Sequence, residues 1–111
     1  MIPQRVTLIT LGTADLSRAK AFYGRLGWQP VQEQEGVAFY QLNGMGLGLF
    51  GHDALAADQG RPGAKLGTGA MTLAQNFVTR AEVDAAYAAA LEAGGTGLCL
   101  GSGDEPVLAL G

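Results

Sequence analysis

Residues 6–28 read VTLITLGTADLSRAKAFYGRLGW and place a strand, a turn and a helix in succession. Val6 to Leu11 is rich in β-branched and apolar residues, which is typical of a buried strand. Asp15 stands where its carboxylate can accept hydrogen bonds from the free amides of a helix start. Apolar residues then recur at helical spacing over residues 16–26. Gly27 supplies the left-handed position that ends many helices, so the stretch predicts a strand followed by an amphipathic helix.

Three short strands are predicted after this helix, at residues 28–32, 37–42 and 47–50. The polar turn at residues 33–36 separates the first two. The second and third are separated by residues 43–46, which begin with an Asn-Gly pair, a strong signal for a tight turn. The order strand, helix, strand, strand, strand therefore defines a βαβββ module over residues 5–51.

Residues 52–69 differ in character, because only the short stretch Ala54 to Ala57 hints at a turn of helix. We interpret this segment as a linker between two half-domains or as a flap over a cleft. A second strand-like run follows at residues 70–78, and Thr79 is placed to cap a helix over residues 80–93.

The second half repeats the pattern of the first at a distance of 67 positions, which aligns Leu16 with Val83 and Gly27 with Gly94. Residues 96–100 and 106–110 then predict a hairpin. The prediction is a single α+β domain over residues 1–111, in which the second module, residues 70–111, is an incomplete βαββ unit without its final strand.

Composition excludes several classes of function. The chain has 111 residues, of which 48% are hydrophobic and 15% charged, with a net charge of −3. Because lysines and arginines are scattered, nucleic acid is not an expected partner. The sequence has no apolar stretch long enough to predict a signal peptide or a membrane span. The single cysteine, Cys99, excludes an internal disulfide and indicates a reducing, cytoplasmic setting, where it is expected to be an inert thiol.

Three short runs carry a resemblance to a known family: Leu11-Gly12-Thr13-Ala14-Asp15-Leu16, Ala21-Phe22-Tyr23 and Leu26-Gly27-Trp28. Together they resemble the opening module of the vicinal-oxygen-chelate superfamily, which includes glyoxalase I, bleomycin-resistance proteins and extradiol dioxygenases. Residues 76–84 resemble the start of that family's second helix. The resemblance implies paired βαβββ modules whose sheets curl around a common cavity.

The resemblance also implies where a metal ion would bind. In the family's metalloenzymes, ligands lie on the first and last strands of each module, and these positions fall on Leu8, Gly48 and Gln75. Leu8 has no donor atom, Gly48 has no side chain, and a neutral Gln75 cannot hold a divalent ion alone. The fourth position would lie on the missing strand. No metal and no other cofactor is therefore expected.

The residues predicted to line the cavity combine polar groups on buried strands with aromatic rings. They are Thr10, Trp28, Tyr40, Phe50 and Gln75. For the two aromatic residues Trp28 and Tyr40, packing in the core or in a dimer is an alternative role. His52 and Asp53 are adjacent and have the chemistry of an acid–base pair, although a solvated loop is the favoured interpretation. No catalytic residue is assigned.

The favoured function is non-catalytic binding of a small organic molecule without a complete metal site. One alternative is a metal-dependent lyase or dioxygenase whose site is completed across a dimer. The other is a truncated or frameshifted member without activity. Because the missing strand would leave an open sheet edge, we predict a homodimer in which the partner covers that edge or the cavity.

Overall fold

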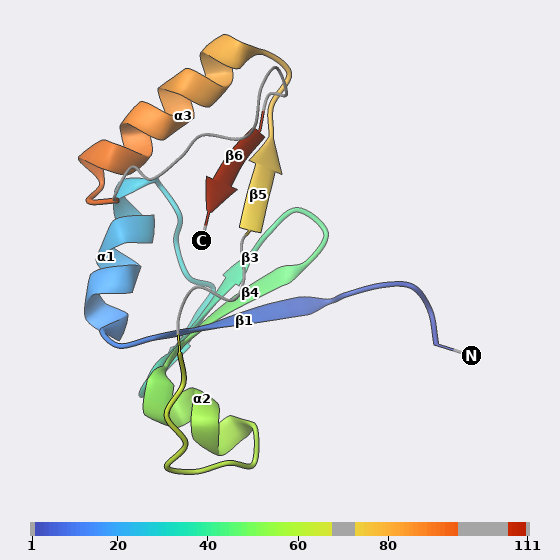
Figure 1. Cartoon of the computed structure of the whole chain (residues 1–111), viewed down its shortest axis with the longest axis vertical. Coiled ribbons are helices and arrows are strands. Elements are labelled where there is room, and N and C mark those ends of the chain that lie inside the picture. The colour runs from blue at the N-terminus through green and yellow to red at the C-terminus, as the bar shows by residue number, and fades with distance from the viewer. Residues whose placement is uncertain (1, 68–72, 96–106, 111) are drawn as a thin grey trace. The chain divides into compact units, whose positions relative to one another are not determined.

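The computed structural model describes residues 2–67, 73–95 and 107–110. The chain divides into two compact units, Met1–Leu66 and Gly67–Gly111, which we call unit 1 and unit 2 (Figure 1). None of the helices in these residues has both the length and the apolar composition to cross a membrane.

Unit 1 is the predicted βαβββ module followed by a short helix. Its elements are β1 (Leu8–Thr13), α1 (Leu16–Arg25), β2 (Gln32–Gln34), β3 (Val37–Gln41), β4 (Gly46–Gly51) and α2 (His52–Asp58). The four strands form one sheet in the order β1-β4-β3-β2. β1 runs parallel to β4, and the other neighbours are antiparallel. The α+β fold class and the first module are therefore confirmed.

The sequence signals around α1 act as expected. Asp15 caps the helix, because its carboxylate accepts a hydrogen bond from the Arg18 amide at 3.0 Å. Gly27 follows the helix with φ +91°, a conformation that a side chain would strain. The Trp28 amide donates back to the Tyr23 carbonyl at 2.9 Å, which completes the helix end.

The strand predicted at residues 28–32 is wrong in position, because β2 covers only Gln32–Gln34. The Trp28 amide is used by the end of α1, and Pro30 has no N–H to donate to a neighbouring strand. Pairing with β3 therefore starts at the Val31 amide, which donates to the Phe39 carbonyl at 2.8 Å.

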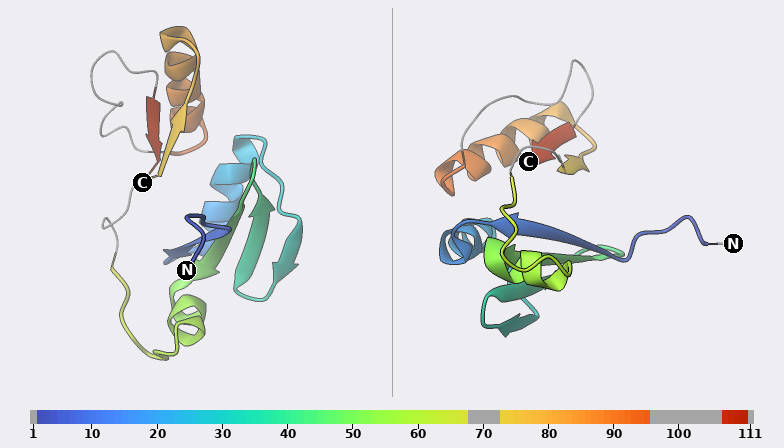
Figure 2. Two further views of the ribbon diagram at one scale, coloured as in Figure 1. Left: turned by 90° about the vertical axis from the view of Figure 1, so that its right-hand side faces the viewer. Right: turned by 60° about the horizontal axis from the view of Figure 1, so that its bottom comes forward.

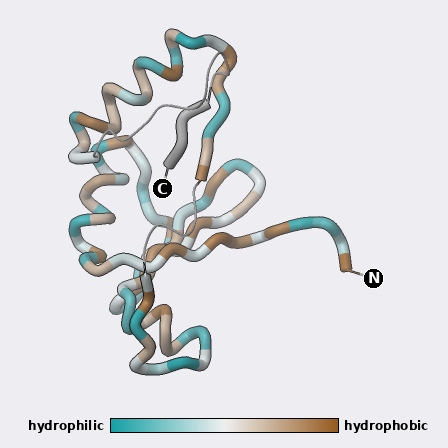
Figure 3. The backbone as a smooth tube through the Cα atoms, viewed as in Figure 1, coloured by the Kyte–Doolittle hydropathy of each residue, from teal (hydrophilic) through white to brown (hydrophobic). Residues whose placement is uncertain are grey.

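The core of unit 1 lies between α1 and the sheet. Its most deeply buried strand residues are Ala38, Tyr40, Leu47 and Leu49. Figure 3 shows β1 as largely apolar along its length. Figure 2 shows α1 alongside the strands and α2 beyond the end of β4. α2 replaces the loop expected after residue 51, and the predicted turn at residues 54–57 lies within it.

Unit 2 contains β5 (Leu73–Asn76), α3 (Arg80–Glu92) and β6 (Val107–Leu110). Thr79 caps α3 as predicted, since its hydroxyl accepts a hydrogen bond from the Glu82 amide at 3.2 Å. β6 pairs with β5 in the antiparallel direction. The strand predicted at residues 96–100, with Cys99, lies outside the described residues.

Candidate functional site

The sheet of unit 1 has two faces that differ in what covers them. Residues opposite one another in paired strands point to the same face, so Thr10, Gly48 and Phe39 share one face. Their neighbours along the strands, such as Tyr40 and Leu47, point to the other, which α1 covers. We call the first the glycine face. It comprises Leu8, Thr10, Gly12, Val37, Phe39, Gln41, Gly46, Gly48 and Phe50.

Two phenylalanine rings lie over Gly48 in the middle of the glycine face. The rings of Phe39 and Phe50 meet edge to face, with centroids 5.8 Å apart and planes at 86°. A Cβ atom at Gly48 would lie 3.2 Å from Phe50 Cε1, 3.3 Å from Phe39 Cε1 and 3.4 Å from Thr10 Oγ1. Gly48 is buried, and its missing side chain is the reason that the rings can pack so closely to the strand.

The structure brings together two of the five predicted lining residues, Thr10 and Phe50, on this face. Phe39 belongs with them and was missed by the sequence reasoning. The signal that identifies Phe39 is strand alternation, because it precedes Tyr40 and must point to the opposite face.

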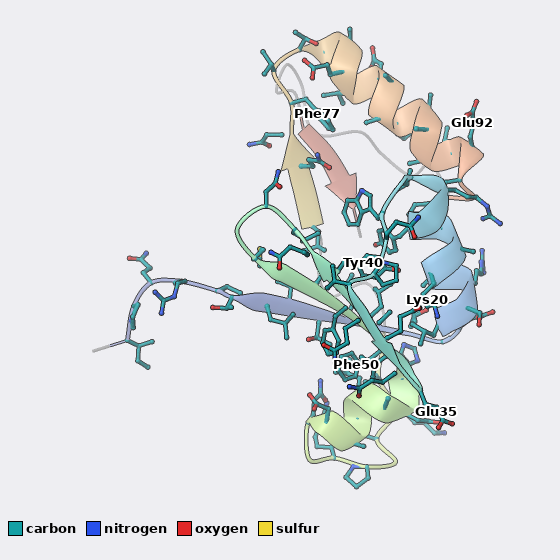
Figure 4. All side chains as sticks on the ribbon, turned by 180° about the vertical axis from the view of Figure 1, so that it is seen from behind. Lys20, Glu35, Tyr40, Phe50, Phe77 and Glu92 are labelled. Carbon is teal, nitrogen blue, oxygen red and sulfur yellow. The ribbon has the colours of Figure 1, made fainter. Side chains whose placement is uncertain are left out.

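Trp28 and Tyr40 lie on the α1 side of the sheet instead. The Trp28 ring stacks on Tyr23 of α1, with centroids 5.2 Å apart, and the Tyr40 ring lies 6.1 Å from Tyr23. Figure 4 shows Tyr40 beside α1 and Phe50 at the end of the sheet nearer α2. Tyr40 therefore packs in the core of unit 1, the alternative role considered for it, whereas Trp28 is half-buried and stacks on Tyr23.

The phenol of Tyr40 is deeply buried. The residue is 3% exposed, and its hydroxyl has no hydrogen-bond partner among the described residues. Burial raises the pKa of Tyr40, and the nearby Lys20 and Glu33 act on it in opposite directions. These two residues form an ion pair at 2.6 Å that joins α1 to β2. Burial also raises the pKa of Tyr23, and the neighbouring Tyr40 raises it further.

Replacing Tyr40 with phenylalanine is expected to preserve or raise stability near pH 8, by up to about 1 kcal/mol, because the hydroxyl is buried without a partner. In the wild type, a pKa raised on folding means that stability is intact below the unfolded value of about 10 and falls as pH rises through the folded value. The variant should show a smaller alkaline loss. Urea titrations followed by circular dichroism at pH 8 and 11 measure both effects. A loss above about 2 kcal/mol at pH 8 would contradict the assignment.

Gln75 lies in unit 2, on β5 opposite Leu108, and it is exposed together with Ala74 and Asn76. The expectation that its amide is buried in a strand is wrong, because β5 presents three consecutive exposed residues. Its exposed amide needs no partner from the protein, since water can satisfy it.

His52 begins α2 and packs against the sheet. Its Cδ2 would lie 3.1 Å, and its Nε2 3.7 Å, from a Cβ atom built on Gly12. Nε2 is buried and has no hydrogen-bond partner within the described ranges. Asp53 is exposed in the first turn of the helix. The solvated loop expected for His52 is therefore wrong, because the segment is helical and its ring rests on Gly12.

The side chains at the implied metal positions do not fit a divalent ion. Leu8 offers no donor atom, and the space beside Gly48 is filled by the two phenylalanine rings. Within residues 2–67, 73–95 and 107–110, no three His, Cys, Asp or Glu side chains lie close enough to hold a metal. Metal ions need several such donors converging on one point.

A βαβββ unit with strand order 1-4-3-2 and its helix on one face, followed by a second strand–helix unit, defines a protein of the paired βαβββ class. The family model of the Glyoxalase/Bleomycin resistance protein/Dioxygenase superfamily matches residues 5–98. The chain belongs to this superfamily, as its sequence resemblance predicts.

Solved structures agree with this assignment. A glyoxalase-related enzyme from Fulvimarina pelagi is 35% identical, with a TM-score of 0.74, and the match covers 83% of this chain and 66% of that one. A lactoylglutathione lyase from Agrobacterium tumefaciens is 27% identical, with a TM-score of 0.56 and coverage of 81% and 72%. A family protein from Nocardioides, at 24% identity and a TM-score of 0.67, shares the fold over 85% of this chain and 64% of its own. The match thus covers between 64% and 72% of the length of these three proteins.

Proposed function

We propose that this protein binds a small organic molecule on the glycine face without a complete metal site. The observation that carries the proposal is the arrangement over Gly48, where two edge-to-face rings and the Thr10 hydroxyl converge. Aromatic walls with a few placed polar groups are typical of small-molecule sites. The donor-free positions Leu8 and Gly48 favour binding over metal-dependent chemistry.

Toluene is a suitable first probe, because the proposed site is largely apolar. We expect saturable binding with chemical-shift changes at residues of the glycine face. Replacing Phe39 with alanine should weaken toluene binding by about two- to twelvefold, since an aromatic contact contributes roughly 0.5–1.5 kcal/mol. The matched control is Val31→Ala, which truncates a side chain that is 69% exposed.

Two outcomes of the toluene titration would contradict the proposal. One is the absence of saturable shifts in the wild type. The other is a set of shifts confined to the α1 side of the sheet, around Tyr23 and Tyr40, with Phe39→Ala binding like the wild type.

The alternative is a metal-dependent lyase or dioxygenase with a site completed across a dimer, which the similarity to a lactoylglutathione lyase keeps open. Titration calorimetry with Zn²⁺, Ni²⁺ and Fe²⁺ distinguishes the two functions. Stoichiometric micromolar binding of any of the three would favour the alternative.

The homodimer and the cytoplasmic location stay predictions. Among the described strands of unit 1, β1 pairs on one side only, with β4, and this open edge supports the idea of a partner.

A further inference from the structure

The end of the glycine face nearest α2 holds a second polar group besides Thr10. Gly12 lies two residues after Thr10 on β1, so both belong to the same face. The imidazole of His52 rests on Gly12, and its Nε2 is buried without a partner in the described part of the chain. A buried polar nitrogen without a hydrogen bond is costly, and this makes Nε2 a group that a bound molecule can satisfy.

The contacts that hold α2 on unit 1 are apolar. A Cβ atom built on Gly12 would lie 2.8 Å from Leu55 Cδ2, and one built on Gly36 would lie 3.5 Å from Ala54 Cβ. Ala56 is fully buried. Among the described residues, no hydrogen bond or ion pair joins a side chain of α2 to the sheet, and the helix has no side-chain cap at its start. Because Ala56 is the one buried residue among the seven of α2, we expect this helix to open at a lower free-energy cost than the strands of the sheet.

From these observations we propose that α2 is a lid over the end of the glycine face and that His52 Nε2 hydrogen-bonds the polar head of the bound molecule when the lid lifts. This inference rests on the proposed function, because it assigns the chemistry of the same site. In the closed state Nε2 is covered, so movement of α2 is required for the contact.

The ligand class follows from the groups on this face. Phe39 and Phe50 favour a flat apolar body. An imidazole nitrogen and the Thr10 hydroxyl can each form a hydrogen bond with a hydroxyl or carbonyl group. The exposed carboxylates Asp53 and Asp58 on α2 disfavour an anionic head. The expected ligand is an uncharged aromatic molecule with one hydroxyl or carbonyl substituent.

Phenol and toluene test this inference, because they match in size and differ only in a hydroxyl against a methyl group. His52 is the chain's one histidine, so its ring ¹⁵N resonances need no further assignment. In the wild type, phenol should shift the Nε2 resonance at saturation and toluene should leave it in place. If phenol leaves Nε2 unchanged, the inference is overturned.

The matched variant is His52→Phe, which fills the same space over Gly12 without a ring nitrogen. The ratio of phenol to toluene affinity should fall about fivefold relative to the wild type, the effect of one lost hydrogen bond. Thr10→Val gives an independent variant on the rigid strand and should also lower the ratio. If the ratio of phenol to toluene affinity is unchanged in His52→Phe while toluene still binds, the lid inference is overturned and the proposed function is not. Failure of toluene to bind the wild type overturns the proposed function itself.

Discussion

Replacing Leu47 with alanine is expected to lower the free energy of unfolding of unit 1 by about 2–5 kcal/mol. Leu47 is 1% exposed and lies in β4, between Ile9 on β1 and Tyr40 on β3. Truncation removes buried apolar contacts and leaves a cavity. Because β4 is paired with β1 on one side and β3 on the other, its backbone cannot move to fill that cavity. For a domain whose total stability is about 5–15 kcal/mol, this is a large fraction.

Urea titration followed by the fluorescence of Trp28 measures the loss, because this residue is the chain's one tryptophan and lies in unit 1. Leu8→Ala is the matched control, since Leu8 lies on neighbouring β1 and is 47% exposed. It should cost less than about 1 kcal/mol. Equal losses in the two variants would show that the sheet does not bury Leu47 as described.

Introducing glutamate at Gly48 is expected to destabilise unit 1 by about 3–5 kcal/mol at pH 7, the range found for an uncompensated buried charge. The new carboxylate would lie beneath Phe39 and Phe50, where Thr10 Oγ1 is the near polar atom. Protonating the carboxyl near pH 4 should recover part of the loss, because the neutral form is less costly to bury. The same urea titration at the two pH values gives both results.

Gly48→Ala separates the effect of charge from that of volume. Its Cβ requires the rings to move by only a few tenths of an ångström, so the change should stay within about 1 kcal/mol. A loss below about 1 kcal/mol for Gly48→Glu would mean that the rings do not enclose this position. Space for a metal-ligating side chain would then exist where the family places one.

Local signals predicted much of unit 1. The Asp15 cap, the end of α1 at Gly27 and the Asn43-Gly44 turn are interactions within a few residues, and Gly44 takes the expected positive φ of +85°. The helical spacing of apolar residues likewise located α3 in unit 2. These features depend on backbone hydrogen bonds and conformational preferences that neighbouring residues determine.

The sequence reasoning did not assign the predicted lining residues to the correct face of the sheet. Tyr40 and Phe50 both read as aromatic residues on strands, but the β3–β4 register pairs Tyr40 with Leu47 and Val37 with Phe50, so their side chains point to opposite faces. Composition cannot reveal this, because a shift of register by one residue exchanges the faces. Similarly, no sequence pattern indicated that His52 would pack on Gly12.

The sequence by itself determined the βαβββ order, the helix ends, the superfamily and the lack of donor atoms at Leu8 and Gly48. Only the tertiary structure decided that Phe39 joins Thr10 and Phe50 over Gly48, that Tyr40 belongs to the core with Trp28 stacked on Tyr23, and that α2 covers Gly12. The physical reason is the range of the interactions. Helix caps and turns form between residues a few positions apart, whereas the parallel pairing of Thr10 with Gly48 joins strands that are remote in the chain and is selected by packing of the whole unit.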